Sequence, residues 1–235
     1  MGLILLWMRI GLAESGIYQK IREKPVAKGN FFLIFSNRER FFRYLRCIGA
    51  GLPTYFVVGL LVTGAPEFGK TLGLSTLPVA GKALLICYLA MSVGNICCGT
   101  LSQYLKSRRK TIIIFNVIVL LGVISFVYLP PSSLFGFYTR CGLLGFGCGF
   151  WALVVTNAAE QFGTNLRATV TITVPNFIRG ALVPIAFIFN LTKPHIGLLH
   201  SAAAIGILTA LLGIISAYLS EETFSKDLEK VQLET

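Results

Sequence analysis

The sequence predicts an all-α integral membrane protein with six transmembrane helices. Hydrophobic residues make up 54% of the 235 residues and charged residues only 13%, whereas a soluble domain is about 25% charged. The mean hydropathy is +0.74. Six apolar runs are each long enough to cross a hydrocarbon core about 30 Å thick. They do not alternate residue by residue as the strands of an outer-membrane β-barrel do, so helices are expected.

Short polar or proline-rich links separate the predicted spans. The spans cover Cys47–Gly64, Lys82–Tyr104, Thr111–Leu129, Leu134–Asn157, Ile172–Leu191 and Ile196–Leu219. Ahead of them, the apolar opening MGLILLWM is too short to cross a bilayer and lacks the features of a secretory signal. We interpret residues 1–8 as the remnant of a preceding transmembrane helix. Residues 9–46 then form a basic cytoplasmic loop, residues 47–219 the membrane domain and residues 220–235 a cytoplasmic tail.

The basic loop contains an amphipathic piece, NFFLIFSNRERFFRYLR, in which phenylalanines alternate with arginines. This pattern suits a helix that lies in the lipid headgroup layer. An apolar linker is an equally good interpretation.

Lysines and arginines mark the side of the membrane on which each link lies, because basic loops stay in the cytoplasm. Fifteen of them fall in the first loop, the second and fourth links and the tail, against three, Lys70, Lys82 and Lys193, on the other side. This count predicts that both termini are cytoplasmic, in a bacterial inner membrane. The net charge of +11 is then mainly a topology signal, and no nucleic-acid partner is expected.

Catalytic and metal-binding motifs are missing from the sequence. The six cysteines lie in or beside apolar spans, where they behave as small hydrophobic residues, and His195 and His200 have no carboxylate neighbour. There is no Gly-x-Ser-x-Gly, no His-Glu-x-x-His and no phosphate-binding glycine loop. We therefore predict no enzyme, no metal and no cofactor.

The spans differ in polarity. The third and the sixth are nearly featureless, so we expect that they can face lipid all round, whereas the others carry polar groups that should face one another or a water-filled cavity. The fourth span also contains the glycine-rich stretch CGLLGFGCGFWA. Its glycines allow either close approach of two helices or bending as a cavity opens and closes.

Four stretches together resemble the carboxyl-terminal half of a major facilitator superfamily transporter of the sugar-porter or metabolite-symporter kind. They are MRIGLAESGIYQK, GTLSQYLKSRRK, AAEQFGTNLRAT and LSEETFSKDLEKVQ. In the family, these correspond to the exit of the sixth helix, the turn between the eighth and ninth, the loop between the tenth and eleventh, and the exit of the twelfth. The resemblance implies one half of a twelve-helix bundle. Where the family's turn has an aspartate, this chain has Ser102 and Gln103.

Opposite charges at the predicted cytoplasmic helix ends form a candidate conformational latch. Arg108 and Arg109 lie at the link between the second and third spans, and Glu160 and Arg167 at the link between the fourth and fifth. Ion pairs between them would hold the helix ends in one state and release them in another.

Arg179 is the leading candidate for a substrate or coupling residue. It lies in the apolar run TITVPNFIRGALVPIAFIFN, between Pro175 and Pro184, and an arginine at a bilayer centre costs roughly 2.5–3.5 kcal/mol. The prolines free backbone carbonyls and are expected to kink the helix. Asn176 lies on the same helical face and is the expected hydrogen-bonding companion. A structural arginine paired across two halves is the alternative.

Further candidates for the cavity wall are Arg140, Tyr55, Asn95 and Trp151. Arg140 lies near the outer end of its span, where it could also reach the headgroups. The other three could equally be contacts between helices.

The sequence thus predicts secondary transport of a small polar or anionic solute by alternating access, coupled to protons. The chain would work with an amino-terminal six-helix half or with a second copy of itself. The alternative is a membrane scaffold without transport activity, or an inactive truncated remnant.

Overall fold

A computed structural model of the chain describes residues 31–225. The predicted helix remnant, most of the basic loop and the last ten residues of the tail lie outside the described residues. Within the described part there are no strands, and six helical segments are long and apolar enough to cross a membrane. These segments are Arg38–Val62, Ala80–Tyr104, Arg108–Tyr128, Leu134–Gln161, Asn165–Ile196 and Leu198–Leu219. The six predicted spans are therefore confirmed.

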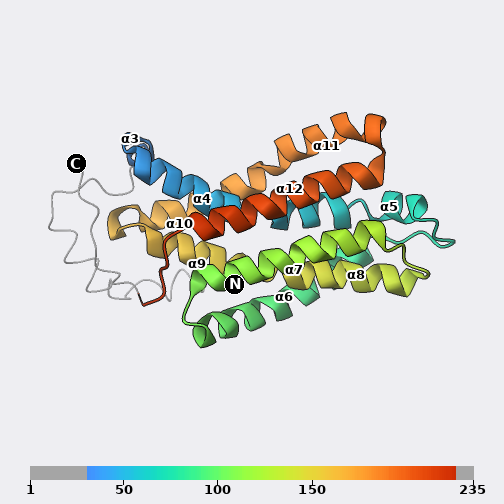
Figure 1. Cartoon of the computed structure of the whole chain (residues 1–235), viewed down its shortest axis with the longest axis horizontal. Coiled ribbons are helices and arrows are strands. Elements are labelled where there is room, and N and C mark those ends of the chain that lie inside the picture. The colour runs from blue at the N-terminus through green and yellow to red at the C-terminus, as the bar shows by residue number, and fades with distance from the viewer. Residues whose placement is uncertain (1–30, 226–235) are drawn as a thin grey trace, which may run out of the picture.

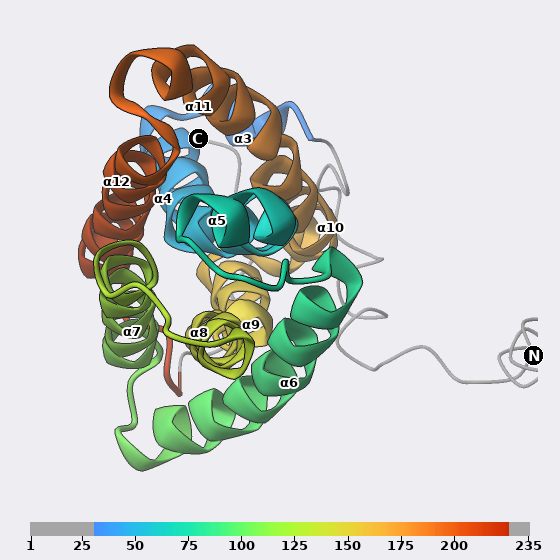
Figure 2. The same ribbon diagram turned by 90° about the vertical axis from the view of Figure 1, so that its right-hand side faces the viewer.

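The spans are built from more than one element where the helix changes its hydrogen bonding. The elements are α3 (Leu33–Ser36), α4 (Arg38–Phe56), the π-helix η1 (Val57–Val62), α5 (Ala65–Thr71), α6 (Ala80–Tyr104), α7 (Arg108–Tyr128), α8 (Leu134–Gly147), α9 (Trp151–Gln161), α10 (Thr164–Gly180), α11 (Leu182–Ile196) and α12 (Leu198–Leu219). They form an elongated bundle with α3 at one end and α5 at the other (Figure 1). Seen along the bundle, α4, α8 and α9 lie centrally, with α6, α7, α12, α11 and α10 around them (Figure 2).

The first span begins earlier than predicted, at Arg38 instead of Cys47. The Asn37 side chain caps α4 by accepting from the Glu39 amide at 2.8 Å, which is why the helix starts there. The guanidinium of Arg40 donates at 2.8 Å to the carbonyl of Leu33 in α3 and is largely buried. The amphipathic piece is therefore not one helix in the headgroup layer, since it is divided between α3 and the first turns of the spanning helix.

The third and sixth spans do not face lipid all round, contrary to the prediction. α12 packs extensively against both α7 and α4. Asn116 of α7 is fully buried, and its amide donates to Ile112 at 3.0 Å and to Ala50 at 3.4 Å. A side chain at Gly213 of α12 would approach the Asn116 Oδ1 to 2.5 Å. Single polar or small residues in these apolar spans therefore mark the buried helix faces.

The glycines of the fourth span bring α8 and α6 into backbone contact. A Cβ at Gly145 would lie 2.1 Å from the Cys87 carbonyl oxygen, and one at Gly149 would lie 2.3 Å from the backbone of Gly94. The close-approach interpretation of these glycines is confirmed. The same stretch ends α8 at Gly147, and α9 begins at Trp151, so the span is also interrupted.

The fifth span is interrupted as well, at Ala181 between α10 and α11. Pro184 has no N–H to donate to the Gly180 carbonyl four residues earlier, which explains a break at this point. Pro175 lies inside α10, which continues past it to Gly180.

Burial is uneven among the spans. In the most apolar windows of α6 and of the α10–α11 span, 22% and 17% of the residues are buried, compared with 50–61% in the other four described spans. These two spans therefore expose the largest share of their surface.

Candidate functional site

The side chain of Arg179 is held in place by Tyr55 of the neighbouring α4. Arg179 lies in the last turn of α10, and its Nε donates to the Tyr55 hydroxyl at 3.0 Å. The guanidinium carbon lies 5.7 Å from the centroid of the Tyr55 ring, which adds a cation–π contact. Tyr55 in turn packs edge-to-face against Trp151 at the start of α9, with ring centroids 5.3 Å apart. Three of the predicted site residues therefore meet in one cluster.

A pocket of about 270 Å³ lies beside this cluster and is formed by α4, η1, α6 and α9. Its walls are Thr54, Tyr55, Val58, Tyr88, Met91, Ser92, Asn95 and Trp151. We call it the aromatic pocket, because three aromatic rings line it. Asn95, a fourth predicted site residue, thus belongs to the same site as Tyr55 and Trp151.

Asn95 joins α6 to α9. Its Oδ1 accepts from the backbone N–H of Ala152 at 3.1 Å, and its Nδ2 donates to the Met91 carbonyl at 3.0 Å. The N–H of Ala152 is in the first turn of α9, where it has no partner within its own helix. The break between α8 and α9 is therefore stabilised by a side chain of the aromatic pocket.

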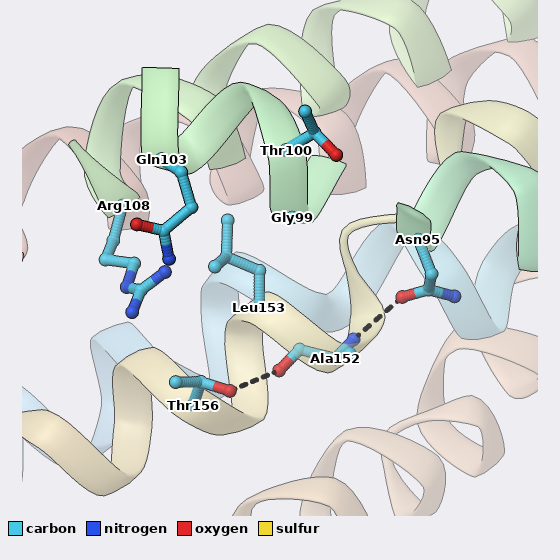
Figure 3. Close-up of a pocket in the computed structure, with 8 residues that line it drawn as sticks. All are labelled: Asn95, Gly99, Thr100, Gln103, Arg108, Ala152, Leu153 and Thr156. Atoms are coloured by element: carbon cyan, nitrogen blue, oxygen red, sulfur yellow. Dashed lines mark hydrogen bonds between the residues drawn. The ribbon is translucent and has the colours of Figure 1, made fainter. Parts of the chain in front are cut away.

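A second, larger pocket of about 570 Å³ extends from Asn95 toward the basic end of the bundle. It is lined by Asn95, Gly99, Thr100, Gln103, Arg108, Ala152, Leu153 and Thr156, with α6 on one side and α9 on the other (Figure 3). We call it the α6–α9 pocket. Asn95 lines both pockets, so they are adjacent, and a polar wall leads from the aromatic pocket to Arg108.

Asn176 and Arg140 do not line the aromatic pocket, and Arg179 lies beside it without forming part of its wall. Asn176 donates to the carbonyl of Ile172 in its own helix at 3.0 Å, so the hydrogen-bonding companion of Arg179 is Tyr55 and not Asn176. Arg140 of α8 is half-buried and lines neither of the two pockets described above. Its Nη1 is buried with no hydrogen-bond partner among residues 31–225.

At the basic end, Arg108 and Glu160 form the predicted pair. Their side chains meet at 3.1 Å and are 16% and 15% exposed. Arg108 also donates to the Ser102 hydroxyl at 3.2 Å, so the serine that stands near the family's aspartate position still accepts from the arginine. This pair joins the start of α7 to the end of α9.

The segment after α12 closes the same cluster. Thr223 is buried, and its hydroxyl lies 2.7 Å from Glu160 and 3.0 Å from Asn157. The carboxylate of Glu222 accepts from the Ser107 hydroxyl and from the backbone N–H of Arg108, the latter at 2.8 Å. We call Ser102, Ser107, Arg108, Glu160, Glu222 and Thr223 the basic-end cluster.

Burial raises the pKa of Glu222, but the hydrogen bonds from Ser107 and from the N–H groups of Arg108, Phe224 and Thr223 outweigh it, so the pKa is lower than usual. Its carboxylate also lies at the N-terminus of α7, where the helix dipole favours negative charge.

The other two predicted latch arginines contact backbone carbonyls. Arg109 donates to the carbonyl of Tyr218 in α12 at 3.4 Å and lies over the Tyr218 ring, 5.6 Å from its centroid. The Nε of Arg167 donates to the Ala159 carbonyl at 3.2 Å. Arg108 and Glu160 are thus brought together, whereas Arg109 contacts a different neighbour, the end of α12.

Sequence reasoning missed Tyr88, Ser107, Glu222 and Thr223. Ser107 carried a usable signal, because it precedes α7 and caps it by accepting from the Lys110 amide at 3.1 Å. Tyr88 had no such signal, because a tyrosine in an apolar span cannot be distinguished from a core residue until its neighbours are known.

Comparison with known proteins gives one family. The sequence profile of the Major Facilitator Superfamily matches residues 1–174. No curated protein sequence matches the chain. The matched range contains Tyr55, Asn95, Trp151 and the Arg108–Glu160 pair, whereas Arg179 follows it.

Proposed function

This chain belongs to the Major Facilitator Superfamily and is an integral membrane transport protein, and we propose that it forms the carboxyl-terminal half of a secondary transporter. In this proposal, a small polar or anionic solute moves by alternating access through a cavity of which the aromatic pocket is one wall. Both termini lie in the cytoplasm of a bacterial cell. Coupling to protons is proposed from the resemblance to metabolite symporters.

The observation that carries the proposal is the setting of Arg179. It is exposed beside the aromatic pocket, in the middle of a membrane span. The ion pairs of the described residues involve Arg43, Arg108 and Lys193, and not Arg179. A cation at this depth without a carboxylate partner suits an anionic group on the solute.

The uneven burial of the spans supports the proposal that a partner completes the transporter. The exposed surfaces of α6 and of the α10–α11 span flank the aromatic pocket, because Tyr88 belongs to α6 and Arg179 to α10. Helices that cover these surfaces would enclose the pocket. We propose that an amino-terminal six-helix half, or a second copy of this chain, supplies them.

The basic-end cluster is proposed to be the latch. It ties the start of α7 to the end of α9 and to the segment after α12, through a partly buried ion pair and hydrogen bonds. Such contacts can differ between two states of a transporter. Arg109 and Arg167 would support it by fixing neighbouring helix ends.

The test is uptake into proteoliposomes that contain the purified chain and an internal pH dye. A panel of small carboxylates, phosphates and neutral polyols is added, and both solute entry and internal acidification are recorded. We expect entry of an anion with acidification, loss of entry in Arg179→Gln, and normal entry in Arg38→Gln, which removes an exposed arginine at the basic end. Equal uptake by Arg179→Gln and the unchanged protein would rule out Arg179 as a solute or coupling residue.

A further inference from the structure

The aromatic pocket has features that go beyond recognition of an anion. The inference drawn from them rests on the proposed function, since it names the class of solute that the same site would take. Three features matter: the nitrogens of Arg179 that can still donate hydrogen bonds, the polar groups of the pocket that already bond to the protein, and the aromatic side chains of the walls.

Arg179 presents a fork of two nitrogens beside the pocket. Its Nε is occupied by the Tyr55 hydroxyl, and the described residues give Nη1 and Nη2 no hydrogen-bond partner. Because the Tyr55 oxygen accepts from Arg179, the phenolic proton of Tyr55 stays free to donate to a solute. Two parallel N–H groups with a neighbouring O–H match the two oxygens of a carboxylate.

Two other polar side chains of the pocket, Ser92 and Asn95, already bond to the protein, whereas the Thr54 hydroxyl is buried with no hydrogen-bond partner among the described residues. The Ser92 hydroxyl donates to the Tyr88 carbonyl at 3.0 Å. Asn95 uses its oxygen for the Ala152 N–H and one amide proton for the Met91 carbonyl. A solute with many hydroxyl groups would leave several of them without partners here, and each unsatisfied group is unfavourable. Ser92 and Asn95 therefore offer little to the hydroxyl groups of a solute, which favours an apolar body.

The walls favour a flat ring. Tyr55, Tyr88 and Trp151 line the pocket together with the thioether of Met91, and aromatic rings gain additional attraction from stacked or edge-to-face contacts with another ring. This half alone provides about 270 Å³, slightly less than the roughly 300–1,000 Å³ typical of ligand pockets, which is room for a small ring and its carboxylate.

We propose that the aromatic pocket binds a small aromatic monocarboxylate, with the carboxylate on the Nη atoms of Arg179 and the Tyr55 hydroxyl and the ring between Tyr88 and Trp151. This assignment differs from the sugar that a sugar-porter-like sequence would suggest. It also explains why a cation and an aromatic pocket occur together at midspan.

Trp151 provides a direct readout, since its indole lines the pocket. The chain contains two tryptophans, so Trp7→Phe leaves Trp151 as the single fluorophore in the purified chain. Three probes separate the contributions. Benzoate carries both features, cyclohexanecarboxylate carries the charge without the aromatic ring, and benzyl alcohol carries the ring without the charge.

We expect saturable quenching of Trp151 by benzoate, about three- to tenfold tighter binding of benzoate than of cyclohexanecarboxylate, and much weaker binding of benzyl alcohol. Arg179→Gln should remove the advantage of benzoate over benzyl alcohol. Tyr88→Leu should remove the advantage of benzoate over cyclohexanecarboxylate and leave the carboxylate preference in place. Tyr104→Leu is the matched control, because Tyr104 is an exposed tyrosine at the far end of the same helix. Circular dichroism and thermal unfolding check that each variant is folded.

Equal affinity for benzoate and cyclohexanecarboxylate would overturn the aromatic assignment. So would the absence of saturation by any carboxylate at millimolar concentration in folded protein. Either result leaves the proposed transporter intact if the proteoliposomes still take up an aliphatic anion or a phosphate. Conversely, selective benzoate binding without uptake of any solute would support this site and contradict transport by the chain paired with a second copy of itself.

Discussion

Tyr55 links the charge of Arg179 to the rest of the protein through its hydroxyl. Replacing Tyr55 with phenylalanine keeps the ring contact with Trp151 and removes the oxygen that accepts from Arg179. We expect anion binding to weaken by about 1 kcal/mol, or roughly fivefold, because one hydrogen bond to the guanidinium and one to the solute are lost. Quenching of Trp151 measures this change. Tyr138→Phe is the control, since the Tyr138 hydroxyl accepts from Val79 outside both pockets.

The partly buried pair in the basic-end cluster should matter more than the exposed pairs around it. Glu160→Gln removes the carboxylate that lies 3.1 Å from Arg108, so the charge of this largely buried arginine loses its ion-pair partner. We expect a loss of about 1–3 kcal/mol, seen as a fall of several degrees in the thermal unfolding temperature. The matched variant Glu39→Gln breaks a pair whose carboxylate is 70% exposed, so it should change stability by less than about 1 kcal/mol. Similar losses for the two variants would contradict a special role of the Arg108–Glu160 pair.

Glu222 makes the stability of this cluster depend on pH. Its pKa is lower in the folded protein than its ordinary value of 4.5, so the unfolded chain takes up the proton first as the pH falls. The stabilisation by Glu222 is therefore complete above pH 4.5 and decreases below it. Unfolding temperatures measured from pH 6 to about pH 3 should fall more steeply in the unchanged protein than in Glu222→Gln. Parallel curves for the two proteins would contradict this prediction.

These residues also show what sequence could and could not predict at this scale. An arginine inside an apolar run is conspicuous, so the sequence alone points to Arg179. It does not reveal the partner of Arg179, because Asn176 is near in sequence whereas Tyr55 is 124 positions away. Glu222 and Ser107 are likewise 115 positions apart, and only the packing of α12 against α7 brings their segments together.

The contact between α6 and α8 depends on the absence of side chains. A Cβ at Gly94 would lie 2.4 Å from the Phe146 carbonyl oxygen, whereas one at Gly99, in the same helix, would meet nothing within 4 Å. We expect Gly94→Ala to destabilise the protein by about 1–3 kcal/mol through overpacking. Gly99→Ala should leave stability unchanged or raise it slightly, because alanine is the better helix former. Thermal unfolding of the two variants compares them, and equal stability would show that the two helices can separate without loss.

Hydrophobic runs predicted the existence and order of the spans well, because each must cross the same thickness of hydrocarbon. Their internal breaks were harder to predict. The glycines of the fourth span were consistent with close packing and with bending, and the structure shows both a close approach at Gly145 and an interruption after Gly147. The π-helix η1 follows Pro53 within one turn or so, and no periodicity in an all-apolar segment distinguishes it from an α-helix.

For the whole molecule, the distribution of charge defines two different ends. α4 and α7, which begin with Arg38 and Arg108, start at the end of the bundle that carries α3, and α5, which contains Lys70, lies at the other end (Figure 1). The described helices thus carry most of their basic residues at one end. Because basic residues are retained in the cytoplasm during insertion, we propose that the α3 end faces the cytoplasm and α5 faces outward.

Cysteine labelling in intact cells tests this orientation. Lys110→Cys and Lys70→Cys place a thiol at an exposed position on each end, in a background in which the exposed Cys97 is changed to serine. A membrane-impermeant maleimide should label Lys70→Cys in intact cells and Lys110→Cys only after the membrane is opened, because the reagent cannot cross the lipid. The reverse pattern would place the basic-end cluster outside the cell. That result would contradict the proposed orientation and put the latch on the external face.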